Sequence, residues 1–291
     1  MAPDPLLKLL TLQILATSRR LPDIEAGLTE MNLHPESMIT ASVNVDISKY
    51  VVNQLSQDGN LRKLNTDIKK KTEDVFLGKA DDMFRWAACQ MDVLKELPST
   101  RPSHLEEVLK DLPASLDETY DRMINNIPPR AHNNALVLLR WLTYSLRPLK
   151  LRELSEARII SLDTADGVVA PHDRGGVEDV LRILSGLILV IDSNGGILTE
   201  SGSDSGLEHL PQDEQGSHQI IRLAHFSAQE YLESSRQAID RPQSFHFQSE
   251  REHGILCHSC IVYRTHCRGT TITETRQGLE HFPLAEYAAR F

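Results

Sequence analysis

Residues 81–127 contain several closely spaced patterns that predict helices, separated by prolines that end helices. This alternation constrains the fold more than any other feature of the sequence. Apolar side chains recur through residues 83–97 at the spacing of one helix face, and Pro98 then ends the predicted helix. We expect Asp81 and Asp82 to cap its start, because carboxylates there satisfy free backbone N–H groups and oppose the positive end of the helix dipole. Such a segment favours short helices that follow a defined path.

Two more helices are predicted in the same segment. Ser103 and Ser115 are each followed three residues later by a glutamate, which is the capping-box pattern, and Pro113 separates the two predicted helices. The side chains of the segment form no catalytic set. We therefore expect these helices to pack on their neighbours.

The residues that precede this segment also predict helices. Residues 32–43 are expected to form a short extended connection, after which Asn44 is predicted to cap a helix over residues 45–57. A second amphipathic helix is predicted over residues 61–79, with Gly78 as its C-cap.

The second half of the chain predicts helices followed by strands. A helix is expected after Pro128, a shorter one within residues 149–160 and a third over residues 177–184. Strands are expected on both sides of Asn194–Gly195, a dipeptide typical of two-residue hairpin turns, and another strand over residues 218–225. Three helices followed by a β-hairpin is the order of a winged helix. The fold class expected from the whole pattern is mainly α with a small β component.

Winged helices often bind DNA, so that function is an alternative. The candidate recognition helix, however, offers Glu178 and Asp179 beside a single cation, Arg182. The loop over residues 200–217 is acidic and rich in Ser and Gly, and it is predicted to be disordered. A formal net charge of −10 also argues against non-specific binding to nucleic acid, which needs clustered Lys and Arg.

Two sequences, MFRWAACQMDVL and LKDLPASLDETYDRMI, resemble the segment that follows the nucleotide-binding core in fungal NACHT-type signalling NTPases. These are STAND-class, NLR-like proteins that often carry C-terminal ankyrin repeats. The resemblance rests on residues that fall in the same order: Met83, Phe84, Trp86, Cys89, Leu112, Pro113, Leu116, Asp117, Thr119 and Tyr120. The stretches WLTYSLRPLKLRELSEA and IRLAHFSAQEYL resemble the winged-helix segment of the same proteins.

The resemblance implies a division of the chain. Residues 1–40 would be the end of the NACHT core, which is a P-loop NTPase fold, and residues 41–127 a helical region. Residues 128–235 would be a winged-helix domain with the acidic insertion at 200–217, and residues 236–291 a helical extension toward ankyrin repeats, whose period of about 33 residues is missing here. In intact relatives, the winged helix is expected to hold the core closed around ADP and to release it on activation.

Arg19 is the one nucleotide-facing residue that the resemblance carries over. It follows an apolar stretch, residues 6–18, that ends in Thr-Ser, as the sensor strand of STAND proteins does. A guanidinium at the carboxyl end of a parallel strand lies where α/β folds bind ligands. The phosphate-binding pattern G-x-x-x-x-G-K-[ST] occurs nowhere in the sequence, and the acidic Mg²⁺-binding strand is also expected upstream. We therefore expect no enzyme activity and no cofactor for this chain alone, whereas intact relatives would use ATP or ADP with Mg²⁺.

One cluster has the residue types of a catalytic triad: His225, Ser227 and Glu230. His225 and Ser227 are too close in sequence for that arrangement, and no G-x-S-x-G elbow is present. We expect His225 to bury its ring at a strand-to-helix corner and Ser227 to cap the helix that follows.

A second cluster, Cys257, Cys260 and Cys267 with nearby histidines, has the residue types of a zinc site. A second ligand pair at the spacing of a structural site is missing, and Cys260 fits the apolar face of a helix. These cysteines are candidate ligands, but we expect no bound metal.

Four cysteines in 291 residues suggest no disulfide scaffold, and a reducing cytoplasmic setting fits them best. No apolar run reaches the roughly 18 residues of a membrane span, and Asp4 stands where a signal peptide would be basic. The expected function is a non-catalytic regulatory fragment of a NACHT-type protein, with protein partners or self-association and with neither membrane nor nucleic acid. The alternatives are a DNA-binding winged helix and a partner that completes a split NTPase site in trans through Arg19.

Overall fold

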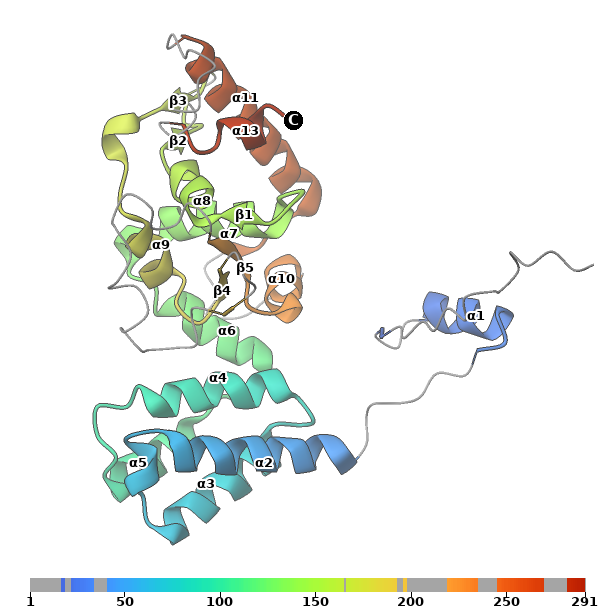
Figure 1. The fold of residues 1–291 in the computed structure, drawn as a ribbon, viewed down its shortest axis with the longest axis vertical. Helices are drawn as coiled ribbons and strands as arrows, with labels where there is room; N and C mark the ends of the chain where they lie inside the picture. The colour runs from blue at the N-terminus through green and yellow to red at the C-terminus, as the bar shows by residue number, and fades with distance from the viewer. Residues whose placement is uncertain are drawn as a thin grey trace, which may run out of the picture. The chain divides into compact units, whose positions relative to one another are not determined.

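The computed structural model describes residues 17–18, 22–33, 41–164, 166–192, 196–197, 219–234, 245–269 and 282–290. The chain divides into two compact units, Met1–Val43 and Asn44–Phe291. In the first unit, the structure describes the helix α1 (Pro22–Glu30), drawn in blue in Figure 1. Arg19 and nearly all of the expected sensor strand lie outside the described residues.

The second unit begins with a part that is entirely helical (Figure 1). We call it the helical part, and its elements are α2 (Ala41–Gln57), η1 (Leu61–Lys63), α3 (Thr66–Lys79), α4 (Phe84–Lys95), α5 (Pro102–Asp111) and α6 (Leu116–Asn125). Trp86 is fully buried at its centre, where its ring meets Phe76 of α3 at a centroid distance of 5.6 Å. The indole Nε1 donates to the carbonyl of Pro113 at 3.1 Å, so one tryptophan ties α3, α4 and the α5–α6 connection together.

The structure confirms one of the two capping-box predictions in the helical part. The cap at Ser115 is confirmed, because its Oγ accepts the N–H of Glu118 at 3.2 Å. The returning carboxylate of Glu118 accepts the N–H of Ala114 at 2.8 Å, one residue before the cap. The prediction for Ser103 is wrong: α5 begins earlier, at Pro102, whose missing N–H and fixed φ suit a first helical position.

The caps predicted at Asn44, Asp81 and Asp82 are also wrong. α2 already begins at Ala41, so Asn44 lies within the helix. Asp81 and Asp82 have φ values of 46° and 58°, a left-handed conformation that the short polar Asp side chain tolerates better than most. These two residues turn the chain between α3 and α4, and the cap position of α4 falls on Met83, whose side chain makes no cap hydrogen bond.

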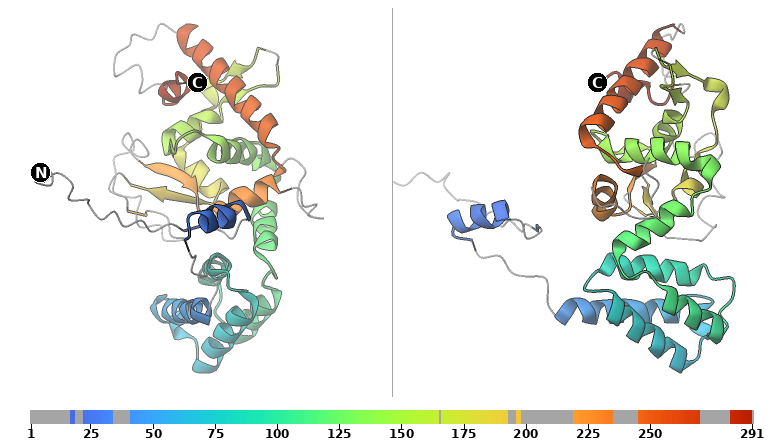
Figure 2. Two further views of the ribbon diagram at one scale, coloured as in Figure 1. Left: turned by 90° about the vertical axis from the view of Figure 1, so that its right-hand side faces the viewer. Right: turned by 180° about the vertical axis from the view of Figure 1, so that it is seen from behind.

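Helices and small antiparallel sheets then form what we call the mixed part. Its elements are η2 (Pro129–Ala131), α7 (His132–Tyr144), β1 (Leu149–Lys150), α8 (Leu151–Ala157), β2 (Ile160–Ser161), β3 (Val168–Val169), η3 (Pro171–Asp173), α9 (Val177–Ile183), β4 (Ile188–Ile191), β5 (Ile220–Leu223), α10 (Phe226–Glu233), α11 (Ser249–Gly269) and α13 (Ala285–Ala288). Both views in Figure 2 show α11 along one side of this part, where it packs against α7, α13 and the β2–β3 pair. The expected fold class, mainly α with a small β component, is confirmed.

The larger sheet has the strand order β1-β5-β4, and both pairings are antiparallel. Ile221 of β5 lies at its centre, opposite Leu149 on one side and Val190 on the other. The expected strand over residues 218–225 is therefore present as β5. The predicted Asn194–Gly195 turn lies outside the described residues, as does the loop 200–217, and the residues next to the turn form an isolated bridge between Ile191 and Ile197.

Buried glutamates paired with arginines cross-link the mixed part. Glu156 of α8 accepts from Arg174 Nε at 2.9 Å and Nη2 at 2.6 Å, and from the hydroxyl of Tyr263 in α11 at 2.8 Å. Glu153, one turn earlier, accepts from Arg147 at 2.8 and 2.7 Å. Each carboxylate receives the planar fork of a guanidinium, which is the geometry that favours retaining a buried charge.

Candidate functional site

The helical part and the mixed part meet where α6 faces α10. Tyr120 Oη of α6 lies 2.8 Å from Ser227 Oγ of α10, and the hydroxyl of Tyr231 donates to Asp121 Oδ1 at 2.5 Å. The two tyrosine rings also lie against each other, with centroids 5.3 Å apart. Apolar and polar contacts therefore join the same pair of helices.

A second contact between the two parts comes from α4. Arg85 Nη2 donates to the carbonyl of Gly186 at 3.0 Å, in the turn between α9 and β4. Gly186 has a φ of 76°, a conformation that favours glycine over any other residue. We call Arg85, Tyr120, Asp121, Gly186, Ser227 and Tyr231 together the polar junction.

Burial in the polar junction keeps the hydroxyl of Tyr120 protonated. Burial raises the pKa of the Tyr120 hydroxyl, while the hydrogen bond with Ser227 and the charge of Arg85 oppose that shift. Burial also raises the pKa of the neighbouring Cys89 thiol. At neutral pH, the cation of Arg85 therefore lies beside the protonated phenol of Tyr120 and the protonated thiol of Cys89.

Of the residues that resembled a catalytic triad, Ser227 belongs to this junction and His225 lies next to it. His225 is exposed and is itself the N-cap of α10: its Nδ1 accepts the N–H of Ser227 at 3.1 Å. The prediction of a buried His225 ring and of a cap at Ser227 is thus wrong, because α10 begins immediately after His225. Ser227 Oγ lies 2.6 Å from His225 Nδ1 and 2.8 Å from Tyr120 Oη, so the hydroxyl links the cap of α10 to α6.

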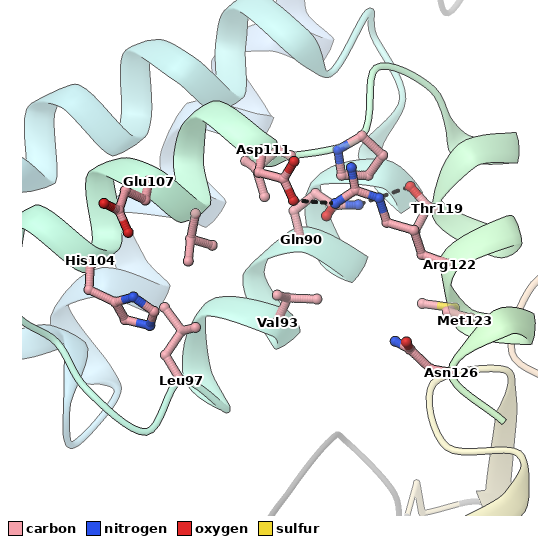
Figure 3. Close-up of a pocket in the computed structure, with 13 residues that line it drawn as sticks. Gln90, Val93, Leu97, His104, Glu107, Asp111, Thr119, Arg122, Met123 and Asn126 are labelled. Carbon is pink, nitrogen blue, oxygen red and sulfur yellow. Dashed lines mark hydrogen bonds and ion pairs between the residues drawn. The ribbon is translucent and has the colours of Figure 1, made fainter. Parts of the chain in front are cut away.

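A groove lies beside the junction and shares helix α6 with it. It has a volume of about 460 Å³ and is walled by α4, α5 and α6, as Figure 3 shows. The buried Gln90 donates to Thr119 Oγ1 at 3.0 Å at its base, and Arg122 pairs with Asp111 at 3.1 Å at its edge. α6 therefore contributes to both the groove and the polar junction.

The cysteines considered as zinc ligands all lie on α11. Cys257 is exposed, whereas Cys260 and Cys267 are buried. Burial raises the pKa of Cys260 to about 12 and that of Cys267 to about 11, so both remain thiols at neutral pH. Within the described ranges, no group of three or more His, Cys, Asp or Glu side chains is placed to hold a metal ion.

Sequence reasoning missed most of the polar junction. In the sequence, Tyr120 was noted only as part of the motif that resembles NACHT-type proteins. No sequence pattern near Arg85 or Gly186 indicated that the two residues form a hydrogen bond. These two residues are 101 positions apart in the chain, so only the fold brings them together. A glycine that follows a short amphipathic helix predicts a turn, but it does not identify which side chain binds its carbonyl.

Comparison with known proteins finds two fungal relatives. The chain is 30% identical over 203 residues to azaphilone pigments biosynthesis cluster protein L of Monascus ruber, a match that covers 68% of this chain and 38% of that protein. It is 22% identical over 202 residues to vegetative incompatibility protein HET-E-1 of Podospora anserina, with 65% of this chain and 14% of that protein covered. The chain thus spans well under half the length of each relative.

No protein-family model and no solved structure matches the chain. In the part of the chain that the structure describes, no helix has both the length and the apolar character needed to cross a membrane.

Proposed function

We propose that this chain is a non-catalytic regulatory and protein-interaction module of a NACHT-type signalling protein. The motif resemblance within residues 83–124 supports the family, and so does the similarity to a vegetative incompatibility protein. The function proposed for this module is to control a nucleotide-binding core through contacts between its own parts. ATP or ADP with Mg²⁺ would bind to that core, with Arg19 as the sensor, and not to the module by itself.

Within this proposal, residues 128–235 form a winged-helix domain and residues 41–127 the helical region that precedes it. The order α7-β1-α8-α9-β4-β5 and the sheet order β1-β5-β4 support a winged helix. Residues 1–40 would be the end of the nucleotide-binding core and residues 236–291 an extension toward repeats. The site of action is cytoplasmic.

The polar junction is the observation that carries the proposal. Hydrogen bonds link Tyr120 to Ser227, Tyr231 to Asp121, and Arg85 to Gly186 across the two parts. At a net value of about 0.5–1.5 kcal/mol each, these three contacts together stabilise the contact between the two parts by roughly 1.5–4.5 kcal/mol. A gap of a few kcal/mol is what a ligand or partner can overcome in a two-state regulatory switch.

The polar character of α9 supports protein contacts over DNA binding. Asp179 accepts a hydrogen bond from Arg182 and lies 3.8 Å from Arg158, so the cations on and beside this helix face a carboxylate. We expect no salt-dependent binding of duplex DNA in fluorescence anisotropy. Binding that weakens steeply with salt would favour the DNA-binding alternative.

Hydrolysis and binding assays test the non-catalytic role. We expect the purified chain to hydrolyse neither ATP nor GTP with Mg²⁺ and to leave the fluorescence of a labelled nucleotide unchanged. Turnover that copurifies with the chain and disappears in Arg19→Ala would contradict the proposal. Activity that appears only when a second chain with a phosphate-binding loop is added would favour the split-site alternative.

Hydrogen exchange measured by mass spectrometry tests the regulatory role of the junction. Removing two hydroxyls, in Tyr120→Phe with Tyr231→Phe, should increase exchange in α10, because α10 loses both of its hydrogen bonds to α6. Exchange in α3, which is distant from these contacts in the chain, should not change. An exchange pattern identical to that of the wild type would show that the junction does not set the opening equilibrium.

A further inference from the structure

The groove beside α6 combines an apolar floor with an acidic edge. Four partly exposed aliphatic or thioether side chains line its floor: Val93, Leu97, Val108 and Met123. Figure 3 shows Val93, Leu97 and Met123 around the open space, with Glu107 and Asp111 of α5 along one edge. Its volume of about 460 Å³ lies within the roughly 300–1,000 Å³ range typical of ligand sites.

Val93 is the most informative residue of the floor. It lies on α4, whose buried face includes Trp86, Gln90 and Leu94, yet its own side chain is 43% exposed. An exposed valine by itself is ordinary. Here it adjoins Leu97 and Met123 in one concave surface, so apolar area is concentrated where a partner side chain would be enclosed on three sides.

The charge on the edge of the groove is unbalanced. Asp111 is paired with Arg122 at 3.1 Å, whereas Glu107 is exposed and makes no ion pair or hydrogen bond with another described residue. The ionisable lining thus holds two carboxylates and one guanidinium, with His104 beside them. Its formal charge of −1 at neutral pH, with His104 neutral, favours a cationic partner.

We propose that the groove between α4, α5 and α6 binds a short amphipathic helical segment of a partner protein, with two aliphatic side chains one turn apart and a Lys or Arg at its edge. The aliphatic side chains would fill the space over Val93 and Met123, in the way that helices bind grooves through anchors at i and i+4. The cation would lie against Glu107. The groove would bind such a segment whether or not the chain regulates a nucleotide-binding core.

The chain's own acidic loop is a poor occupant on charge grounds. Residues 200–217 contain five acidic residues and neither Lys nor Arg, so they would bring like charge to Glu107 and Asp111. A second copy of the chain, with a net charge of −10, would be repelled in the same way at low salt. Charge therefore favours a different, basic partner.

Selection from a peptide library tests this proposal with the full chain. A phage-displayed library of random dodecapeptides is panned on the immobilised chain, and recovered peptides are measured as fluorescein conjugates by polarisation. We expect enriched peptides to pair aliphatic residues at i and i+3 or i+4 and to carry Lys or Arg. Their affinity should fall at least about tenfold in Val93→Glu, since a charge would replace the apolar floor.

A matched control separates the groove from general effects of an added charge. Val52 on α2 is 45% exposed, almost the same as Val93, but lies outside the groove, so Val52→Glu should leave the affinity unchanged. Glu107→Lys keeps the floor intact and should also weaken the basic peptides about tenfold, with a smaller salt dependence of binding. Because Glu107 is exposed, this variant should unfold at the same temperature as the wild type.

Several outcomes would overturn the proposal. They are the recovery of no binding peptide, enrichment of peptides without basic residues, and equal affinity for the wild type and Val93→Glu. Light scattering provides a separate outcome: a wild-type dimer that becomes monomeric in Val93→Glu would make a second copy the occupant instead.

Discussion

Replacing Glu156 by glutamine should destabilise the mixed part by about 3 kcal/mol. The side chain of Glu156 is 4% exposed, and its carboxylate accepts two hydrogen bonds from Arg174 and one from Tyr263. Glutamine has nearly the same size, but it is neutral and would direct an NH₂ group at these donors. Breaking a buried charge pair by changing one partner costs about 3–5 kcal/mol. The side chain of Arg174 is 37% exposed and can regain water, so the lower end of that range applies.

The assay is urea unfolding followed by far-ultraviolet circular dichroism. With a slope of about 2–3 kcal/mol per molar urea, the midpoint should fall by roughly 1–1.5 M. Tyr263→Phe removes one hydrogen bond to the same carboxylate and should cost about 1.5 kcal/mol. The double variant should cost less than the two changes added together, because both act on one network.

A surface pair provides the control. Arg290 and Glu286 form an ion pair at 2.9 Å with both side chains more than half exposed, and Glu286→Gln should change stability by less than about 0.5 kcal/mol. If Glu156→Gln also changes stability by less than about 0.5 kcal/mol, the cost of burying the pair cancels its attraction, and the reasoning is refuted.

Three further predictions follow from burial and backbone conformation. Only Cys257 should react rapidly with a thiol reagent near pH 8 in the folded chain, since the other three thiols are buried and have raised pKa values. All four thiols should react in denaturant, and Cys257→Ser should abolish the fast phase of the folded chain. Gly186→Ala should lower stability by about 1–2 kcal/mol in thermal unfolding, because alanine is strained at a φ of 76°. Gly254 lies within the helix α11 and provides the control. A loss of stability in Gly186→Ala that is smaller than the loss in Gly254→Ala would contradict this prediction. Burial raises the pKa of Tyr263 above its usual 10, so its contribution to stability is complete below pH 10 and is lost as pH rises. Tyr263→Phe should therefore lose less stability than the wild type between about pH 9 and 11, and equal losses would exclude this tyrosine as a cause.

The sequence predicted some helix starts correctly and others wrongly, although each depends on residues within one helical turn. Ser115 was identified as a cap from a spacing of three residues, because cap and helix are a local unit. The pattern at Ser103 was equally good, yet Pro102 begins α5 one residue earlier and takes precedence. Asp81 and Asp82 have the right chemistry for a cap but form the turn before Met83. Several residues compete for each helix start, and packing on the rest of the chain decides among them.

Sequence alone determined the fold class, the prolines that divide the helical part, the cap at Ser115, the strand at β5, and the resemblance to a signalling family. These depend on periodicity and on interactions between residues a few positions apart. Only the tertiary structure decided that Arg85 binds the carbonyl of Gly186, that Ser227 links α10 to Tyr120, and that α4, α5 and α6 leave a groove. Each of these features joins segments distant in sequence, and such contacts depend on how whole helices pack, for which a local pattern holds no information.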